Sequence, residues 1–530
     1  MRGVLRLLLF ALFAVASDGL KFLVFNPRIG RSHTMQMGKL ADQLAAAGHD
    51  VVNFQPLVYP LATTGVSHKS VRTIEFKAKN VTILQTSAMT TGVWLDDMFK
   101  FQGIGTAIRA LGNNYLDYCL EAISDNELME SFKKEKFDLI ISEFFSACGA
   151  VLGEKLGISK SILVSGMPLQ LDLTGLYGIP STPSFVPDSI HTHGVNGFFE
   201  RINSLIGFVK TSIFTENLVN LQAEALEKVE TKRTFNEILA SASYVWVNTD
   251  EFVDFPRPIS HKYVNIGGLG MKESLKKAGK LPEEIENIYK RAKKGVVFMS
   301  FGSVAQSKFM PDANKKAILE AFSQLPEVEF IWKYENLTEE LPGPIPSNVY
   351  LSNWLPQRDI LLHPKTLAFI THGGMNSITE ATWSGVPMIC IPLFGDQARN
   401  GAMIKRKKVA EVLSKFDLNK KDVIIETVRK FINDKHYKEQ AVKLAEIIRN
   451  KPISPEERVV QTAEFAAKYD VEEHLDMDGR KLSTIQFYNL DIIFAIISTA
   501  ILVVVIGFFA LRRAYITLSG ILGFSKQKRE

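Results

Sequence analysis

Residues 354–397 place two strand patterns around a helical pattern, and this unit constrains the fold more than any other part of the chain. Leu367 to Thr371 is a short apolar run typical of a buried strand, and a helical pattern follows from Asn376 to Trp383. Gly385 ends that pattern, and Val386 to Ile391 is a second buried strand. The segment therefore predicts a β-loop-α-β unit of a parallel sheet.

The loop of this unit is suited to an anion. Gly373 and Gly374 precede the predicted helix, so a phosphate could approach the backbone N–H groups at the helix N-terminus, where the helix dipole favours negative charge. A simpler explanation is open for two nearby residues. Ser377 and Glu380 have the spacing of a capping box, which would account for both without any ligand.

Polar clusters flank the unit on both sides. Trp354-x-Pro-Gln357 precedes the first strand, and Asp396-Gln397 follows the second. Open α/β sheets bind ligands at the carboxyl ends of their strands, where these clusters converge. From Trp354 to Gln397 the sequence resembles, without a gap, the signature of the UDP-glycosyltransferases, the family that includes animal glucuronosyl- and glucosyltransferases.

The resemblance implies an α/β fold of the GT-B type, in which two Rossmann-like domains face each other across a cleft. It also implies contacts with a UDP-sugar donor. The implied positions are Trp354 on the uracil face, Gln357 near the base or ribose, Glu380 on the ribose hydroxyls, His372, Ser303 and the N–H groups near Gly374, Asn376 and Ser377 on the diphosphate, and Asp396 and Gln397 on the sugar hydroxyls.

The rest of the chain supports two such domains. Strand patterns alternate with helical patterns in two series, which predicts two parallel sheets. The predicted strands are Phe22–Phe25, Val51–Val52, Phe137–Ile141, Ser161–Val164 and Tyr244–Val247 in the first series, and Val296–Met299, Phe330–Trp332, Val349–Leu351, Leu367–Thr371 and Met388–Ile391 in the second. The predicted organisation is a signal peptide (1–16), an acceptor-binding domain (17–255), a Pro- and Gly-rich linker (256–290), a donor-binding domain with return helices (291–486), a membrane span (487–511) and a basic tail (512–530).

His33 and Glu143 are the candidate catalytic pair. His33 lies at the junction of the first loop and first helix, where the helix dipole favours a neutral imidazole that can accept a proton. A solvated side chain is the alternative for each residue taken alone. The resemblance implies that His33 is the general base and that an acidic residue after a middle strand orients it. The family commonly has Asp at that place, whereas this chain has Glu143, which is one methylene longer.

The two ends of the chain predict its topology. Arg2 and Arg6 flank a short apolar run typical of a secretory signal peptide. Ile492 to Leu511 would form roughly 30 Å of apolar helix, enough to cross a bilayer, and the basic residues after it favour a cytosolic tail. The last five residues, with Lys526 and Lys528, resemble a dilysine retrieval signal. We therefore expect a single-pass type I protein of the endoplasmic reticulum membrane, with its domains in the lumen.

Other sequence features limit which partners and cofactors are expected. Asn80 and Asn336 stand in glycosylation sequons, and three cysteines allow at most one disulfide. The formal net charge is +5, and the sequence has no basic stripe of the kind that binds nucleic acid. The expected partners are a UDP-sugar co-substrate, a small lipophilic acceptor and membrane lipid, with self-association left open. No metal or other cofactor is expected, and the acidic pair Asp476 and Asp478 is interpreted as solvated.

Together these observations predict an inverting, metal-independent transfer of glucose or glucuronic acid from a UDP-sugar to a hydroxyl group. Two alternatives remain: a silent family member that binds a lipophilic ligand, and a sugar-nucleotide epimerase or hydrolase of the same fold.

Overall fold

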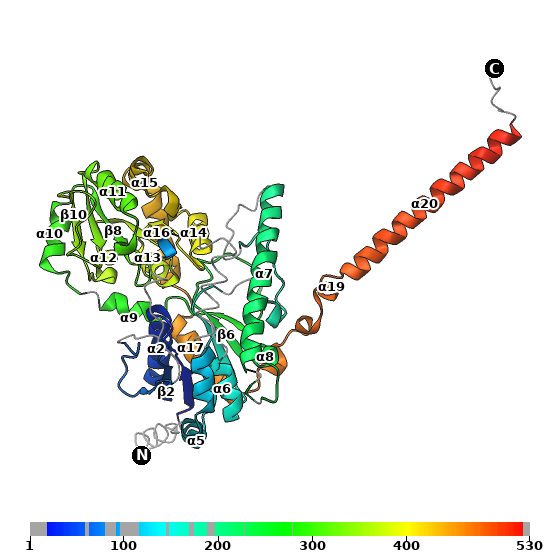
Figure 1. Cartoon of the computed structure of the whole chain (residues 1–530), viewed down its shortest axis with the longest axis horizontal. Helices are drawn as coiled ribbons and strands as arrows, with labels where there is room; N and C mark the ends of the chain where they lie inside the picture. The colour runs from blue at the N-terminus through cyan, green and yellow to red at the C-terminus, as the bar shows by residue number, and fades with distance from the viewer. Residues whose placement is uncertain are drawn as a thin grey trace, which may run out of the picture. The chain divides into compact units, whose positions relative to one another are not determined.

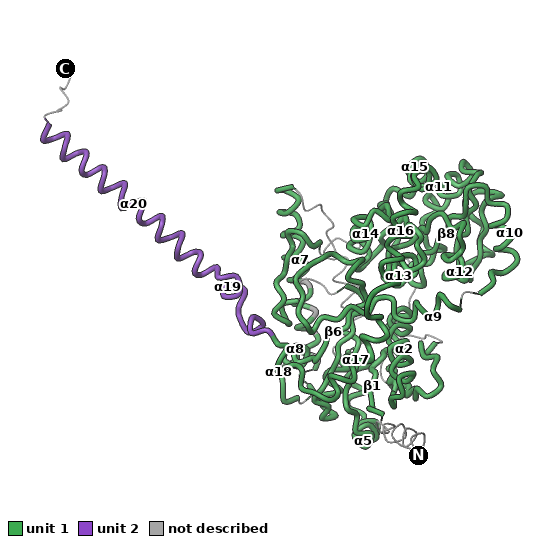
Figure 2. The backbone as a smooth tube through the Cα atoms, turned by 180° about the vertical axis from the view of Figure 1, so that it is seen from behind, with its two compact units in different colours: residues 1–476 green, residues 477–530 purple. Residues whose placement is uncertain are grey.

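The protein divides into two compact units, Met1–Asp476 and Met477–Glu530 (Figures 1 and 2). The computed structural model describes residues 19–58, 63–79, 92–95, 116–144, 148–168, 174–187, 197–226, 228–229, 231–277 and 279–522. The predicted signal peptide, Asn80 and the end of the tail lie outside these residues.

Unit 1 contains two parallel sheets, and the first has seven strands in the order β3-β2-β1-β4-β5-β6-β7. Its strands are β1 (Lys21–Phe25), β2 (Asp50–Pro56), β3 (Arg72–Phe76), β4 (Leu139–Glu143), β5 (Ser161–Ser165), β6 (Tyr244–Val247) and β7 (Tyr263–Asn265). Along β1, Phe22 and Val24 enter one core layer while Leu23 and Phe25 enter the other. This alternation explains why the strand is apolar throughout, since successive side chains point to opposite faces and both faces are covered.

Helices cover both faces of the first sheet. The layer with Leu23 contains apolar residues of α5 (Asn126–Glu135), α6 (Cys148–Leu156) and α8 (Phe235–Ala240), whereas the layer with Phe22 contains those of α2 (Arg31–Ala46). A disulfide joins Cys119 to Cys148, and Cys390 is a buried free thiol. The long helix α7 (Phe198–Leu226) extends from the vicinity of α8 in both views of the backbone (Figures 1 and 2).

The second sheet has six strands in the order β10-β9-β8-β11-β12-β13. They are β8 (Gly295–Ser300), β9 (Val328–Lys333), β10 (Val349–Ser352), β11 (Thr366–Thr371), β12 (Met388–Cys390) and β13 (Ala410–Val412). One core layer packs α10 (Glu283–Arg291), α12 (Gln357–Leu362), α13 (Met375–Ser384) and α16 (His436–Arg449), and the other packs α11 (Asp312–Ser323) and α15 (Lys421–Asn433). The two sheets thus repeat one architecture.

The segment predicted to be a linker, 256–290, has more structure than expected. It contributes β7 to the edge of the first sheet, then forms α9 (Met271–Lys276) and most of α10. Its Pro and Gly residues lie between these short elements, so the composition indicated turns correctly but did not exclude a strand and two helices.

The chain returns to the first sheet after completing the second. Helix α17 (Pro455–Lys468) places Val459, Ala463 and Ala466 in the core layer that contains α2. Trp246 of β6 donates its indole N–H to the Thr462 hydroxyl at 3.0 Å. The first domain therefore includes a helix from the C-terminal part of unit 1.

Unit 2 consists mainly of α20 (Leu490–Ile521), which follows η4 (Asp478–Lys481) and α19 (Thr484–Phe487). By its length and composition α20 could cross a membrane, with a mean hydropathy of 3.0 in its most apolar window. The helix continues beyond Leu511, the predicted end of the span, because Arg512 and Arg513 are also helix formers.

Candidate active site

Four of the predicted site residues lie where the strand order of each sheet reverses. In the first sheet that point is between β1 and β4, and in the second it is between β8 and β11. His33 follows β1 and Glu143 ends β4, whereas Ser303 follows β8 and His372 follows β11. At such a point the connections that follow the two adjacent strands run to opposite sides of the sheet. This leaves a crevice for a ligand at the carboxyl ends of the strands.

His33 and Glu143 are in direct contact. The Nδ1 atom of His33 lies 3.0 Å from Oε1 of Glu143, whose side chain is buried. His33 is the third residue of α2, and a Cβ atom on Gly166 would lie 3.0 Å from its ring. The ring is therefore held between the strand end that carries Glu143 and the backbone at Gly166.

The electrostatics of His33 differ from the expectation that the helix dipole would keep it neutral. Burial alone would lower the pKa of His33, but the hydrogen bond and charge of Glu143 and the charge of Asp396 outweigh burial and raise the pKa above 6.5. The dipole argument was wrong because two carboxylates oppose it. His33 is consequently a stronger base than an exposed histidine.

Asp396 comes from the second half of unit 1. It accepts a hydrogen bond from Asn400 Nδ2 at 2.6 Å, and burial raises the pKa of its carboxyl group despite that bond. Its charge contributes, as the smallest of the raising effects, to the raised pKa of His33 in the first half. Gln397 is buried, and its side-chain oxygen accepts the backbone N–H groups of Leu393 and Phe394 at 2.9 and 3.1 Å. That oxygen orders the loop beside Asp396.

The capping-box explanation for Ser377 and Glu380 is excluded. Helix α13 begins at Met375 with Gly374 as its N-cap, and among the described residues no side chain caps it. Ser377 is therefore the third helical residue, three places too late to be the N-cap. Asn376 is exposed and accepts a hydrogen bond from Asn248 Nδ2, at the end of the first sheet, at 3.2 Å. The helix N-terminus remains suited to an anion, as predicted.

His372 lies in a narrow space between two glycines. A Cβ atom on Gly374 would lie 2.6 Å from His372 Nε2, and one on Gly302 would lie 2.9 Å from Cε1. Burial and the charge of Lys333 lower the pKa of His372 to about 4, so the ring is neutral at neutral pH. Its Nδ1 atom is buried and has no hydrogen-bond partner within the described part of the chain.

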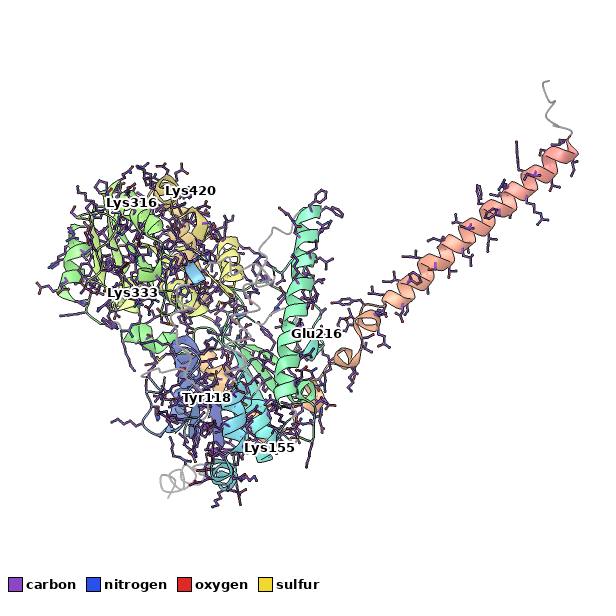
Figure 3. All side chains as sticks on the ribbon, in the orientation of Figure 1. Tyr118, Lys155, Glu216, Lys316, Lys333 and Lys420 are labelled. Atoms are coloured by element: carbon purple, nitrogen blue, oxygen red, sulfur yellow. A yellow bond between two sulfur atoms is a disulfide. The ribbon has the colours of Figure 1, made fainter. Side chains whose placement is uncertain are left out.

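Lys333 is a site residue that sequence reasoning missed. It ends β9 and is labelled in Figure 3. Its ammonium group donates to the Gly302 carbonyl at 2.7 Å. Its position at the end of the strand next to β8 was the available signal, but a lysine at a strand end is common on any surface. The structure thus places a cation beside His372 and the loop that carries Ser303, which is exposed.

The remaining donor-site residues form a second cluster. Gln357 Nε2 donates to Glu380 Oε2 at 2.6 Å, and burial raises the pKa of Glu380 despite the opposing effects of Gln357, Lys39 and Arg358. Trp354 is 69% exposed, which is unusual for a tryptophan side chain. The structure therefore brings Gln357 and Glu380 into contact and leaves the indole ring of Trp354 accessible.

Two other sequence features have local roles. Asn336 accepts hydrogen bonds from the backbone N–H and the hydroxyl of Thr338 within its sequon. Asp476 forms an ion pair with the buried Lys262, which gives it a structural role and corrects its interpretation as a solvated residue. In the described parts of the chain no group of His, Cys, Asp or Glu residues is arranged to hold a metal ion.

Two parallel sheets that share the order of their first six strands, with polar residues at both points of reversal, define the fold class as GT-B. Solved structures of this class share the fold. A glycosyltransferase of Phytolacca americana, solved with UDP-2-fluoro-glucose and pterostilbene, matches with a TM-score of 0.56 at 15% identity over 85% of this chain and 100% of its own. The glycosyltransferase VinC, solved with dTDP, matches with a TM-score of 0.55 at 16% identity over 85% and 100%.

Sequence comparison defines the family. The chain belongs to the UDP-glucoronosyl and UDP-glucosyl transferase family, whose model matches residues 21–523. UDP-glucuronosyltransferase 1A1 of Rattus norvegicus is 30% identical over 94% of this chain and 92% of its own length. UDP-glucosyltransferase 2 of Dactylopius coccus is 32% identical over 92% of both. The protein is therefore a glycosyltransferase that transfers a sugar from a UDP-sugar donor.

Proposed function

We propose that the protein transfers glucose or glucuronic acid from its UDP-sugar to a hydroxyl group of a small lipophilic acceptor, with inversion at the anomeric carbon. Relatives named as a glucuronosyltransferase and a glucosyltransferase support keeping both donors in the proposal. Membrane anchoring favours a lipophilic acceptor, because such compounds partition into the bilayer near the enzyme. The contact between His33 and Glu143 is the observation that carries this proposal.

In this mechanism His33 is the general base. Glu143 accepts a hydrogen bond from the Nδ1–H group of His33, which leaves Nε2 as the basic nitrogen. Nε2 removes the proton from the acceptor hydroxyl as its oxygen attacks the anomeric carbon. The bond from the anomeric carbon to the diphosphate oxygen breaks, and UDP leaves with that electron pair. Glu143 is a positioning residue, and its charge stabilises the imidazolium that forms.

The donor residues keep the roles implied by the family resemblance. Trp354 stacks on uracil, Glu380 binds the ribose, and the N-terminus of α13 binds the diphosphate. His372 is neutral, so it would donate a hydrogen bond rather than a positive charge. The charge of Lys333 and the helix N-terminus would stabilise the leaving group, which is why we propose transfer without a metal ion.

We also propose an endoplasmic reticulum location with unit 1 in the lumen. The disulfide between Cys119 and Cys148 favours an oxidising compartment, and α20 has the length and composition of an anchor. Protease added to sealed microsomes should remove only the short tail. Loss of the whole protein would contradict the orientation.

The direct test is to measure UDP release from several UDP-sugars with a panel of lipophilic alcohols and phenols, with and without a metal chelator. Wild type should show acceptor-dependent turnover that resists the chelator, and NMR of the product should show an inverted anomeric centre. His33→Ala should lose about a hundredfold or more in kcat, the range for a general base. Acceptor-independent turnover would support an epimerase or hydrolase, and ligand binding without turnover would support a silent family member.

A further inference from the structure

Residues 92–95 lie between β3 and α5 of the first domain in sequence, but they pack into the core of the second domain. Val93 and Trp94 are 0% and 3% exposed, and they belong to the apolar layer that contains residues of α11 and α15. Figure 1 shows this short helical turn in light blue among the green and yellow elements around the second sheet. A tryptophan that fills a pocket of another domain is typical of an interface anchor.

Three contacts hold the turn in place. Trp94 donates its indole N–H to the Gln306 carbonyl at 3.0 Å. Its ring meets the ring of Phe301 edge-on, with centroids 5.0 Å apart and planes at 80°. Lys415 of η3 (Lys415–Asp417) is buried and donates its ammonium group to the Val93 carbonyl at 2.7 Å. A buried ammonium group needs acceptors, so the backbone of the first domain is part of the environment that this lysine of the second domain requires.

The contacts of Trp94 lie on both sides of Ser303 in the loop after β8. Phe301 precedes the exposed serine, and Gln306 follows it, immediately before η2 (Ser307–Phe309). From within the second domain, Lys333 holds the same loop through its hydrogen bond to a loop carbonyl. The loop is therefore fixed by its own sheet and, independently, by a residue of the first domain.

We propose that Trp94 is a positioning residue for the UDP-sugar, through which the first domain completes the diphosphate site of the second. The inference rests on the proposed function, in which Ser303 contacts the diphosphate. A loop that is already ordered binds its ligand without a further loss of conformational entropy. Without the indole contact the donor has to order the loop when it binds, so donor affinity falls. The rate of the chemical step changes less, because the general base His33 is held by Glu143 in the first sheet.

The test is a calorimetric titration of the full-length protein, in detergent micelles, with UDP. Trp94→Phe keeps an aromatic ring beside Phe301 and removes the N–H donor. The variant should fold, because the Gln306 carbonyl also accepts the Phe309 N–H at 3.2 Å. We expect the Kd for UDP to rise by about tenfold, near the upper end for the loss of one hydrogen bond. The KM for the UDP-sugar should rise by a similar factor, with kcat and the KM for the acceptor within about twofold of wild type.

Two further variants separate this effect from general stability. Trp246→Phe is the matched control, because Trp246 is also buried and donates its indole N–H to the Thr462 hydroxyl at 3.0 Å, within the first domain. It should lower the temperature of thermal unfolding and leave the Kd for UDP unchanged. Lys415→Met removes the donor to the Val93 carbonyl from the side of the second domain, and it should weaken UDP binding in the same direction as Trp94→Phe.

A double-mutant cycle tests whether Trp94 acts through the loop. Ser303→Ala should weaken UDP binding by itself. Trp94→Phe should then cost less affinity in the Ser303→Ala background than in the wild type, because residues that act through one shared contact have non-additive effects.

Any of four results would overturn the proposal. They are an unchanged Kd for UDP in Trp94→Phe, an equal loss of affinity in Trp246→Phe, an unchanged Kd in Ser303→Ala, and fully additive effects of Trp94→Phe and Ser303→Ala. Failure of the proposed function is a separate outcome. It would appear as UDP binding without transfer to any acceptor, and the same titrations would still decide the role of Trp94.

Discussion

The substitution Glu143→Gln tests the catalytic pair most directly. It preserves the shape of the side chain and an oxygen that can accept from His33 Nδ1, but it removes the negative charge 3.0 Å away. A hydrogen bond to a charged group contributes about 1.5 to 3 kcal/mol. The substitution should therefore remove stabilisation of that order from the imidazolium and lower the pKa of His33.

The direction of the pH effect follows from the role of His33. The base is active only when deprotonated, and the carboxylates raise its pKa above 6.5, so kcat/KM of the wild type should fall as pH decreases through that raised pKa. In Glu143→Gln the acid limb should move to lower pH, because the imidazolium loses its stabilisation by the carboxylate. The plateau rate should fall by roughly tenfold, because a weaker base removes the acceptor proton less effectively.

The assay is the initial rate of UDP release at subsaturating donor and acceptor from about pH 5 to 9. A matched control exists on the same domain, because Glu464 of α17 lies 3.0 Å from His49 Nε2. Glu464→Gln should leave the acid limb in place. An acid limb that is unchanged in Glu143→Gln, in a variant whose plateau rate has fallen, would refute the claim that Glu143 acts through His33.

Three further predictions address the donor site and the fold. Trp354→Ala should weaken UDP binding by about 1 to 3 kcal/mol in calorimetry, with thermal stability unchanged, because the indole is 69% exposed; a large stability loss would show that its role is packing. Gly374→Ala should abolish donor binding, measured by the same titration, because the new Cβ would lie 2.6 Å from His372 Nε2. Lys451→Ala should destabilise unit 1 by roughly 3 to 5 kcal/mol in thermal unfolding, because it leaves the buried carboxylate of Asp250 without its partner at 2.7 Å; adding Asp250→Asn should restore part of the loss.

Sequence patterns predicted the interior strands of both sheets and the edge strand β10, but missed the other three edge strands. Three strands were not predicted, β3, β7 and β13, and each is an edge strand. An edge strand of a parallel sheet is covered less completely, so it need not be a continuous apolar run. The five residues of β3, for example, are all exposed or partly buried. The central strands are buried on both faces and were recognisable from their apolar residues alone.

The sequence predicted the part of the candidate site whose residues lie close together along the chain. The residues around α13 follow one another along the chain, so their common position at strand ends could be inferred. The contacts that join the two halves could not. Asn248 meets Asn376, and Arg399 meets Asp254 at 2.6 Å, although each pair is separated by more than a hundred residues. The pKa of His33 also depends on residues distant in sequence, because Glu143 raises it most and Asp396 adds a smaller effect.

The return of α17 to the first sheet has a consequence for biosynthesis. The core layer beside α2 needs Val459, Ala463 and Ala466, which leave the ribosome only after the whole second sheet has been synthesised. Until then the nascent N-terminal domain has an apolar face without its cover, and domains otherwise tend to fold in order of synthesis. The protein should therefore depend on chaperones for longer than a chain whose domains mature one after the other. A chain stopped before Pro455 should be degraded even though it contains His33, Glu143 and every predicted donor contact.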